Sequence, residues 1–281
     1  MNKPNHEYQM LSLPHTLKVR EMVSAYHVFR EPGYKFEGEY HNFWEIVCVL
    51  DGSAGVAADG QIYPLEKGQI IFHRPMEFHR IWTEGNKAVE LAIMSFTADG
   101  MERFEKKIMT LANGRMEELE QLIVQIPLAF SFDGSGITGL SDNPLEEQIF
   151  CNALELFLLK TMRDANVSRR QDNSPSAKNY NHIVRILNEH VEKNLSLEEL
   201  SHLCDMSVSN LKKTFHKYTG IGIMKYFTGL KMKHAIRLME QGLTIAEVSR
   251  ALSYTDQNYF SVVFKREIGY PPSIYRKMQQ L

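Results

Sequence analysis

Two short stretches near the C-terminus carry amide, hydroxyl and amino side chains that could hydrogen bond to the edges of nucleic-acid bases. They lie within residues 207–219 and 256–268, on the side of each stretch opposite its apolar residues. Asn and Gln can bind adenine through two hydrogen bonds, Lys can reach guanine, and Val can contact the methyl group of thymine. The candidates for base contacts are Ser209, Asn210, Lys212, Lys213, His216, Gln257, Asn258, Ser261 and Val262, and those for phosphate contacts are Lys217, Lys265 and Arg266.

A second group of polar side chains lies in the N-terminal third of the chain. If residues 41–45 form a strand, His41 and Glu45 point to the same face of it. Together with His79 they could bind a divalent metal ion, or they could simply hydrogen bond to each other. A third alternative is a small polar ligand, such as a sugar, held by aromatic faces and a few convergent polar groups. The side chains that would line this effector site are Tyr34, His41, Glu45, Arg74, His79 and Trp82.

The first C-terminal stretch belongs to a predicted helix-turn-helix unit over residues 196–219. Ser196 and Glu199 have the spacing of a capping box at the start of its first helix. Ser207 is placed to cap the second helix, and Gly220 follows the end of that helix as a C-terminal cap. The residues expected to face inward are Leu197, Leu200, Leu203, Leu211 and Phe215.

A second unit is predicted over residues 244–268 by the same signals. Thr244 and Glu247 form another capping box, and a helix from about residue 256 to residue 268 ends at Gly269. The residues expected to face inward are Ile245, Val248, Leu252, Tyr259, Phe260 and Phe264.

A long helix is predicted between the two units, over residues 223–239. If it is rigid, it could hold the second helices of the units about one DNA turn apart, roughly 34 Å. Both of these helices could then enter the major groove on one face of a duplex.

The charge of the chain is divided unevenly. Residues 178–281 contain 15 Lys and Arg against 9 Asp and Glu, a net charge of +6, whereas residues 1–177 contain 17 against 25, a net charge of −8. A basic part that follows an acidic part is typical of a chain whose last part binds a polyanion. One polar helix face is more often merely solvated. Two capped units in a basic region favour double-stranded DNA over the alternative of an acidic protein partner.

The N-terminal part is expected to be β-rich from about Val19 to Phe96. Short apolar or alternating segments are separated by turn signals, and this pattern predicts an antiparallel sandwich or barrel. Helices are expected over residues 101–112, 116–126 and 145–165. An apolar stripe on the last helix leaves two interpretations open, packing on the barrel and a dimer interface. It consists of Leu145, Ile149, Ala153, Leu156 and Phe157.

Residues 167–177 are polar, have little to bury and predict a linker. The fold class is therefore α+β with two domains. We expect a barrel over residues 1–100, a helical, dimerising region over 101–166, and an all-α domain with two helix-turn-helix units over 178–281.

Residues 195–277 resemble the DNA-binding domain of the AraC/XylS family of transcriptional regulators. The matching residues are Leu197 to Leu200, Met206-Ser207, Leu211, Phe215, Thr219-Gly220, Tyr226, Ile245, Val248, Asn258 to Phe260, Phe264-Lys265, Gly269 to Pro272 and Tyr275-Arg276. Family members carry two such units in a seven-helix domain, so the resemblance implies that each unit inserts a recognition helix into DNA. The sequence departs from the family pattern at Ser253, where a turn glycine is usual, and at Lys231, where Arg is usual.

The N-terminal part resembles the cupin barrel that precedes this domain in many AraC-type regulators. The resemblance lies in His41 to Glu45, Asp51-Gly52, Gly60, Gly68, Pro75 and His79. Many free-standing cupins are metal-dependent enzymes. However, Phe43 stands where the metal motif has a second His, and the Glu of that motif comes later. We therefore expect no metal, no cofactor and no catalytic residue. A metal-dependent cupin enzyme fused to a helical module remains the alternative.

The expected partners are double-stranded DNA, a small-molecule effector such as a carbohydrate, and a second copy of the chain. RNA polymerase joins them if the protein is an activator, a point that the sequence leaves open. Three widely spaced cysteines fit neither a disulfide framework nor a zinc site, so a reducing cytoplasm is the simplest compartment. No apolar stretch is long enough to span a bilayer, and the N-terminus lacks the pattern of a signal peptide.

Overall fold

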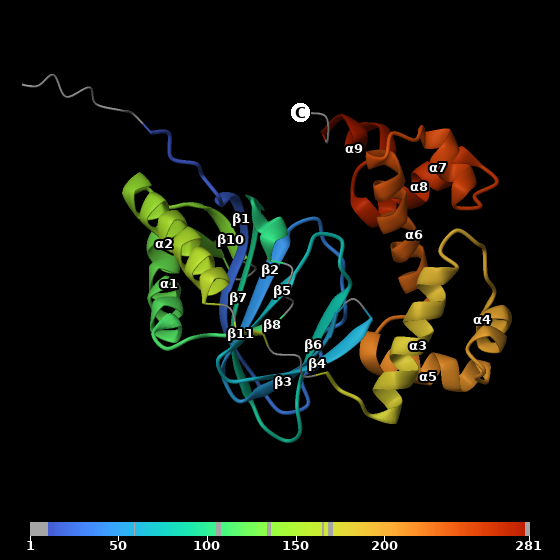
Figure 1. Ribbon diagram of the computed structural model, residues 1–281, viewed down its shortest axis with the longest axis horizontal. Coiled ribbons are helices and arrows are strands. Elements are labelled where there is room, and N and C mark those ends of the chain that lie inside the picture. The colour runs from blue at the N-terminus through green and yellow to red at the C-terminus, as the bar shows by residue number, and fades with distance from the viewer. Residues whose placement is uncertain are drawn as a thin grey trace, which may run out of the picture.

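The computed structural model describes residues 11–58, 60–104, 108–133, 136–164, 166–167 and 171–278. The N-terminal part is a β-barrel with two helices on one side, and the C-terminal part is a group of helices beside the barrel (Figure 1). The expected α+β architecture of two domains is confirmed. Among the described residues, no helix is both long enough and apolar enough to cross a membrane.

The barrel consists of two antiparallel sheets, with strand orders β1-β7-β2-β5-β8-β11 and β4-β3-β6. The strands of the larger sheet are β1 (Lys18–Arg30), β7 (Val89–Asp99), β2 (Trp44–Asp51), β5 (Gln69–His73), β8 (Ile108–Thr110) and β11 (Asn166–Val167). The strands of the smaller sheet are β4 (Gln61–Glu66), β3 (Ser53–Ala58) and β6 (His79–Thr83).

Strand β2 shows how the sequence places a polar group inside the barrel. Trp44 and Ile46 pack into the core beneath the two helices, whereas Val47 and Val49 join the core between the two sheets. Because side chains alternate across a strand, Glu45 lies on the same face as Val47. Its carboxylate is therefore directed into the barrel, near one end.

Helices α1 (Arg115–Ala129) and α2 (Pro144–Arg163) cover the outer face of the larger sheet (Figure 1). The helix expected over residues 101–112 is wrong. Its described part contains a short 3-10 helix, η1 (Met101–Arg103), followed by β8, and residues 105–107 lie outside the described part of the chain. Strand β8 pairs with β5 because Ile108 and Met109 bury on opposite faces of the sheet, in two different cores. The predicted helical region also contains a hairpin, β9 (Phe130–Asp133) and β10 (Gly136–Leu140).

The apolar stripe predicted on α2 does not form a single face. Phe157 is buried in the core below α2, together with Phe150 and Leu154. Leu145 is 71% exposed and Leu156 is 51% exposed. Packing on the barrel accounts for Phe157, whereas Leu145 and Leu156 leave half or more of their surface exposed to solvent.

The C-terminal part comprises α3 (Pro175–Glu189), α4 (Leu197–Leu203), α5 (Val208–Thr219), α6 (Ile223–Glu240), α7 (Ile245–Ala251), α8 (Gln257–Ile268) and α9 (Pro272–Met278). These helices form two hydrophobic cores, one at each end of α6. The first, around Tyr180 and Phe215, also contains Phe78 of the barrel. The second, around Phe260 and Phe264, contains Met76.

The linker expected over residues 167–177 is wrong at both ends. Val167 belongs to β11, which pairs with β8, and residues 168–170 lie outside the described part of the chain. Helix α3 already begins at Pro175, because the Ser174 side chain caps it and proline suits the first turn of a helix. The backbone N–H of Asp172 donates to the Ile62 carbonyl at 2.9 Å, which ties the connection to the barrel.

Candidate DNA interface and effector site

The first helix-turn-helix unit is formed by α4 and α5, and the sequence predicted how both helices begin. The Ser196 hydroxyl accepts from the Glu199 N–H, and the Glu199 carboxylate accepts from the Ser196 N–H at 2.7 Å. Ser207 caps α5, and Gly220 ends it with a φ of 71°. This left-handed conformation costs glycine little.

One inward residue of this unit was predicted wrongly. Leu203 is 40% exposed, and Cys204, which is 3% exposed, occupies the core in its place. The reason is the helical repeat: Leu200 is fully buried, and the residue four positions later lies on the same face.

Helix α5 presents the predicted base-contacting side chains to solvent. Leu211 and Phe215 are fully buried on the opposite face. The exposed residues are Ser209, Asn210, Lys212, Lys213, His216 and Lys217. Lys217 is not available in the way expected, because its Nζ donates to the Ser176 hydroxyl at 3.1 Å and lies 3.2 Å from the Tyr218 hydroxyl. Its role in phosphate binding stays a prediction.

The second unit, α7 and α8, repeats the design of the first. Thr244 and Glu247 form the predicted capping box, and Gly269 ends α8 with a φ of 90°. Ser253 in the turn has a φ of 59°. This conformation explains why the family pattern favours glycine at that place. The Ser253 hydroxyl donates to the Glu192 carbonyl at 2.7 Å and so holds the turn.

On α8, one inward residue was also predicted wrongly. Tyr259 is 60% exposed, because Phe260, Val263 and Phe264 have the spacing that fills the core. Its ring lies 6.1 Å from the ring of Tyr254. The candidates for DNA contact on the outer face are Gln257, Asn258, Val262, Lys265 and Arg266, all exposed, and Ser261, partly buried.

The two units are joined through α6 and a small hydrogen-bond network. Lys231 on α6 donates to the Leu252 carbonyl at 2.9 Å, next to the turn of the second unit, and to the Asn194 side chain at 2.7 Å. Asn194 in turn donates to the Ser253 carbonyl at 2.7 Å. Burial lowers the pKa of Lys231 to about 8. The network therefore fixes the second unit against α6 and the segment that precedes α4.

Three of the predicted effector residues meet at one end of the barrel: His41, Glu45 and His79. The Nε2 atom of His79 lies 3.3 Å from Glu45 Oε1, and Nε2 of His41 lies 3.8 Å from Glu45 Oε2. Burial lowers the pKa of His41 to about 4. Burial acts to raise the pKa of Glu45, but the hydrogen bond and charge of His79 outweigh it and hold the value at about 2. Burial acts to lower the pKa of His79, yet Glu45 raises it above its usual value.

The other three predicted effector residues lie elsewhere. The Tyr34 ring faces the Arg30 guanidinium at 4.8 Å. The Trp82 ring lies 6.2 Å from the Tyr218 ring of α5, and its Nε1 donates to Glu84. Arg74 is exposed and lines a different cavity. The sequence grouped these six residues because it could not show which strand faces point inward.

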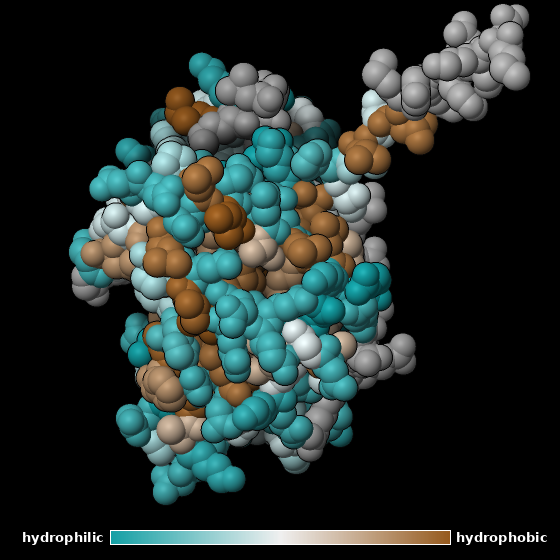
Figure 2. Space-filling model, turned by 90° about the vertical axis from the view of Figure 1, so that its left-hand side faces the viewer, coloured by the Kyte–Doolittle hydropathy of each residue, from teal (hydrophilic) through white to brown (hydrophobic). Residues whose placement is uncertain are grey.

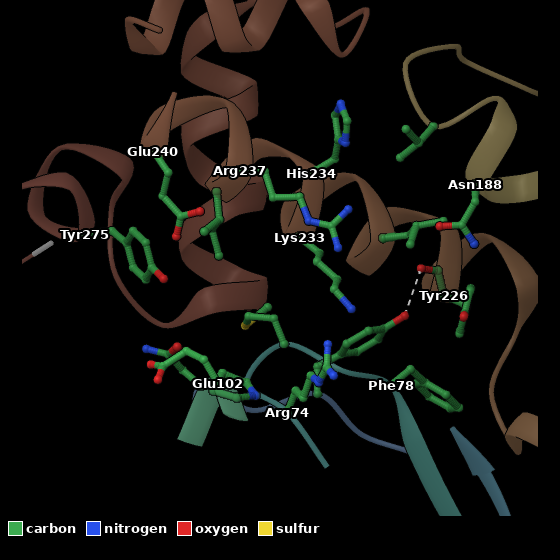
Figure 3. Close-up of a pocket in the computed structure, with 17 residues that line it drawn as sticks. Arg74, Phe78, Glu102, Asn188, Tyr226, Lys233, His234, Arg237, Glu240 and Tyr275 are labelled. Carbon is green, nitrogen blue, oxygen red and sulfur yellow. Dashed lines mark hydrogen bonds between the residues drawn. The ribbon is translucent and has the colours of Figure 1, made fainter. Parts of the chain in front are cut away.

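A cavity of about 950 Å³ lies between one end of the barrel and the C-terminal helices. Arg74 and Phe78 line it from the barrel, and Lys233, His234 and Arg237 line it from α6 (Figure 3). Lys233 and Arg237 extend from α6 into the space above Arg74. Further polar side chains come from Glu102, Asn188, Tyr226, Glu240 and Tyr275. We call this space the interdomain cleft.

Arg80 on β6 is a functional candidate that sequence reasoning missed. Its guanidinium donates to the Phe36 carbonyl at 2.7 Å and to the carbonyls of Lys217 and His216 at 2.9 and 3.3 Å. The last two belong to the C-terminal turn of α5, where a positive charge also suits the helix dipole. Burial lowers the pKa of Arg80. A single arginine among strand residues carries no sequence signal for a contact 136 positions away.

Segment 36–40 makes further contacts between the barrel and the C-terminal helices. The Gly38 N–H donates to the Thr219 carbonyl at 3.3 Å, and the Tyr40 hydroxyl donates to the Tyr226 carbonyl at 3.3 Å. A Cβ added at Gly229 of α6 would lie 2.7 Å from a ring atom of Tyr40. The absence of a side chain at Gly229 therefore allows α6 to approach the barrel closely.

A β-barrel with a polar cluster at one end, joined to two helix-turn-helix units, is typical of ligand-binding transcriptional regulators. An AraC-like ligand binding domain model matches residues 22–126, and a helix-turn-helix domain model matches residues 200–278. The chain belongs to the AraC family of transcriptional regulators, with an N-terminal ligand-binding domain and a C-terminal DNA-binding domain.

Curated relatives cover nearly the whole chain at low identity. The HTH-type transcriptional activator RhaS of Escherichia fergusonii is 22% identical over 88% of this chain and 90% of its own length. The Msm operon regulatory protein of Streptococcus mutans serotype c is 25% identical over 87% and 88%, respectively. Among solved structures, ToxT from Vibrio cholerae is 15% identical, covers 91% of this chain and 99% of its own, and superimposes with a TM-score of 0.38.

Proposed function

We propose that this regulator reads specific DNA sequences with α5 and α8 in consecutive major grooves of one duplex. The observation that carries the proposal is the pair of capped units at the two ends of α6, each with an exposed polar face on its second helix. Helix α6 has 18 residues and is roughly 27 Å long at 1.5 Å per residue. This length is of the order of one turn of DNA, roughly 34 Å, though somewhat shorter.

The effector is proposed to be a small polar molecule, such as a carbohydrate, bound in the interdomain cleft. Tyr40, which is partly buried, offers an aromatic ring there, and Asn188 and Glu240 offer hydrogen-bonding groups. A ligand in the cleft would contact both parts of the chain. It could therefore favour one relative placement of the DNA-binding helices, which is what an effector must do to change DNA affinity.

A homodimer is proposed through the outer face of α1 and α2. Val124, Leu128, Ile149 and Leu156 are about half exposed or more, and Leu145 more still. Figure 2 looks onto this side of the molecule, where brown apolar side chains lie among teal polar ones. Exposed apolar patches of this kind mark interaction surfaces. A second copy would place two DNA-binding domains on one operator, and RNA polymerase would be a further partner if the protein activates transcription.

We assign no enzymatic activity. The relatives are named as regulators, and a metal-dependent cupin enzyme finds no support among them. A regulator needs only equilibrium binding by its ligand-binding and DNA-binding parts.

Selection of bound sequences from a random duplex library, followed by titration of the selected site at several salt concentrations, tests the DNA proposal. We expect one preferred sequence and an affinity that falls steeply with salt, because phosphate contacts release counterions. Enrichment of no sequence, or binding that an acidic protein outcompetes but duplex DNA does not, would contradict the proposal. Repeating the titration with a panel of sugars tests the effector separately.

A further inference from the structure

Four side chains at one end of the barrel are arranged like the ligands of a metal ion. Glu39, His41, Glu45 and His79 each offer one ligand atom, and these atoms all lie within 4.8 Å of one another. Nε2 of His79 is 3.3 Å from Glu45 Oε1 and 3.8 Å from Glu39 Oε1. In a tetrahedral site with metal–ligand bonds of about 2.1 Å, neighbouring ligand atoms lie roughly 3.4 Å apart. The cluster needs only small movements to reach that geometry.

The remaining ring nitrogens are engaged in the way that ligand histidines require. Nδ1 of His41 lies 3.0 Å from the Phe43 carbonyl, and Nδ1 of His79 lies 3.2 Å from the Glu77 carbonyl. A carbonyl can only accept, so each Nδ1 carries the hydrogen. In the neutral rings, the lone pair of Nε2 then faces the cluster. Metal-bound histidines almost always donate their other nitrogen to a carbonyl or carboxylate in this manner.

Other contacts hold the ligands in place. The Ser95 hydroxyl donates to Glu45 Oε2 at 2.9 Å, and the Ser24 hydroxyl donates to Ser95. The Phe43 ring stacks on the His41 ring with centroids 3.9 Å apart. Phe43, which we placed where the cupin metal motif has a second His, therefore supports His41, a ligand in this different set of donors.

The two Nε2 atoms are buried, and neither makes a well-formed hydrogen bond with the described residues, although that of His79 lies 3.3 Å from Glu45 Oε1. His79 is only 5% exposed and His41 only 9%. Buried polar atoms in native proteins rarely lack a partner, and each exception calls for an explanation. A proton shared between His79 and Glu45 would serve one of these atoms. The Nε2 atom of His41 would still lack a hydrogen bond, because Glu45 Oε2 lies 3.8 Å from it.

We propose that Glu39, His41, Glu45 and His79 bind one first-row divalent transition-metal ion. Two imidazole nitrogens and two carboxylate oxygens suit Zn²⁺ and its neighbours, whereas Ca²⁺ and Mg²⁺ prefer oxygen ligands alone. Four protein ligands complete a tetrahedral shell, which is typical of a structural site rather than a catalytic one. Glu39 is 47% exposed, so the ion could enter the site from the side of Glu39.

The ion would act on the contact between the barrel and the first helix-turn-helix unit. The backbones of Glu39 and His79 pair through hydrogen bonds of 3.1 and 3.2 Å. One residue before Glu39, Gly38 donates to Thr219 at the end of α5, and one residue after it, Tyr40 contacts Tyr226 of α6. Bound metal would fix this segment to the barrel and so stabilise the docked position of α5. This role does not depend on an effector in the interdomain cleft.

The test uses the untagged full chain, stripped with a chelator and then titrated with Zn²⁺. We expect one equivalent of tightly bound Zn²⁺ per chain by elemental analysis, and a rise in melting temperature on binding. Glu39→Gln should weaken the affinity for Zn²⁺ at least about tenfold and remove most of the thermal shift. Glu37→Gln, in the same exposed segment but outside the cluster, is the matched control and should bind as the wild type does.

His41→Gln is the second variant. Because His41 is a neutral ligand, a loss of Zn²⁺ affinity in this variant cannot be attributed to the loss of a negative charge, as it could be in Glu39→Gln. Its far-ultraviolet circular dichroism without metal checks that it folds. A stripped wild type that takes up no stoichiometric metal would overturn the proposal, as would Glu39→Gln and His41→Gln variants that bind Zn²⁺ as tightly as the wild type. DNA binding measured on the same samples is a separate readout. Its persistence without metal leaves the proposed function intact.

Discussion

The two helix-turn-helix units share one local design but differ in what surrounds them. Each begins with a capping box and ends its second helix at a left-handed glycine. The core of the first unit contains Ala57, Ile62 and Phe78 of the barrel, and Arg80 binds the end of α5. The core of the second unit contains only Met76 from the barrel among the described residues.

This difference shows where a signal from the barrel can act. A change at the barrel end reaches the first unit through direct contacts, whereas it reaches the second unit chiefly through α6 and Lys231. We therefore expect a change in the barrel to alter the position of α5 more than that of α8. Helix α8 would then contact DNA in the same way before and after the change.

Matched truncations in the two cores should separate the units. Phe215→Ala and Phe260→Ala each remove a fully buried ring, and each should cost about 3–5 kcal/mol of stability. Amide hydrogen exchange should show that Phe260→Ala loosens residues 244–275 and leaves the barrel unchanged. Phe215→Ala should loosen α5 and also the barrel surface around Phe78. Identical exchange patterns in the two variants would contradict the difference between the two units in their contact with the barrel.

Arg80→Ala should release the first unit from the barrel. It removes charge-assisted hydrogen bonds to the end of α5, which are typically worth about 1.5–3 kcal/mol each to the contact. Hydrogen exchange in the last turn of α5 should become faster, and the second unit should be unaffected. Arg20→Ala, which breaks an exposed pair with Asp99, is the control and should cost no more than about 1 kcal/mol. Unchanged exchange in α5 would mean that Arg80 does not hold the helix.

Removing one amide from each recognition helix should affect different base pairs. Asn258→Ala should cost roughly 1–3 kcal/mol at one position of the site and relax specificity there. Asn210→Ala should act at a position about one DNA turn away. Affinities for a set of single-base variants of the selected site measure both effects. If both substitutions relaxed the same position, the two helices could not lie in separate grooves.

Lys265→Ala should give the smallest and least specific effect. Lys265 is exposed on α8, and its ammonium group makes no hydrogen bond or ion pair with the described residues. If it binds a phosphate, its loss should weaken binding to all sequences about equally and reduce the salt dependence by about one ion. A loss confined to the selected sequence would instead mean that Lys265 contacts a base.

Local signals predicted more of this molecule than long-range ones. Capping residues such as Ser196 and Thr244 act within four positions, so the sequence located both units correctly. Leu203 and Tyr259 were assigned to the cores because apolar character alone does not decide between adjacent positions on a helix. The start of α3 was missed although Ser174 and Pro175 carry the signal for it.

The sequence predicted that the N-terminal part is an antiparallel sandwich or barrel, but not which of its residues contact each other. Alternation gives the face of each strand but not which strands meet, so Tyr34 and Trp82 were grouped with His41 although they lie elsewhere. Arg80 was missed because its partners on α5 are distant in sequence, and Glu39 because only its pairing with His79 brings it to the cluster. Such contacts become visible only when the sheets are closed and docked on the helices.

Hydroxyl-radical footprinting of the full chain on its selected DNA site would show directly whether α5 and α8 bind consecutive major grooves. We expect, within each half-site, two protected segments on one face of the duplex, with centres about 10 base pairs apart. Asn210→Ala should weaken one segment and Asn258→Ala the other. A single protected segment, or two segments on opposite faces of the duplex, would contradict the claim that α5 and α8 read consecutive major grooves together.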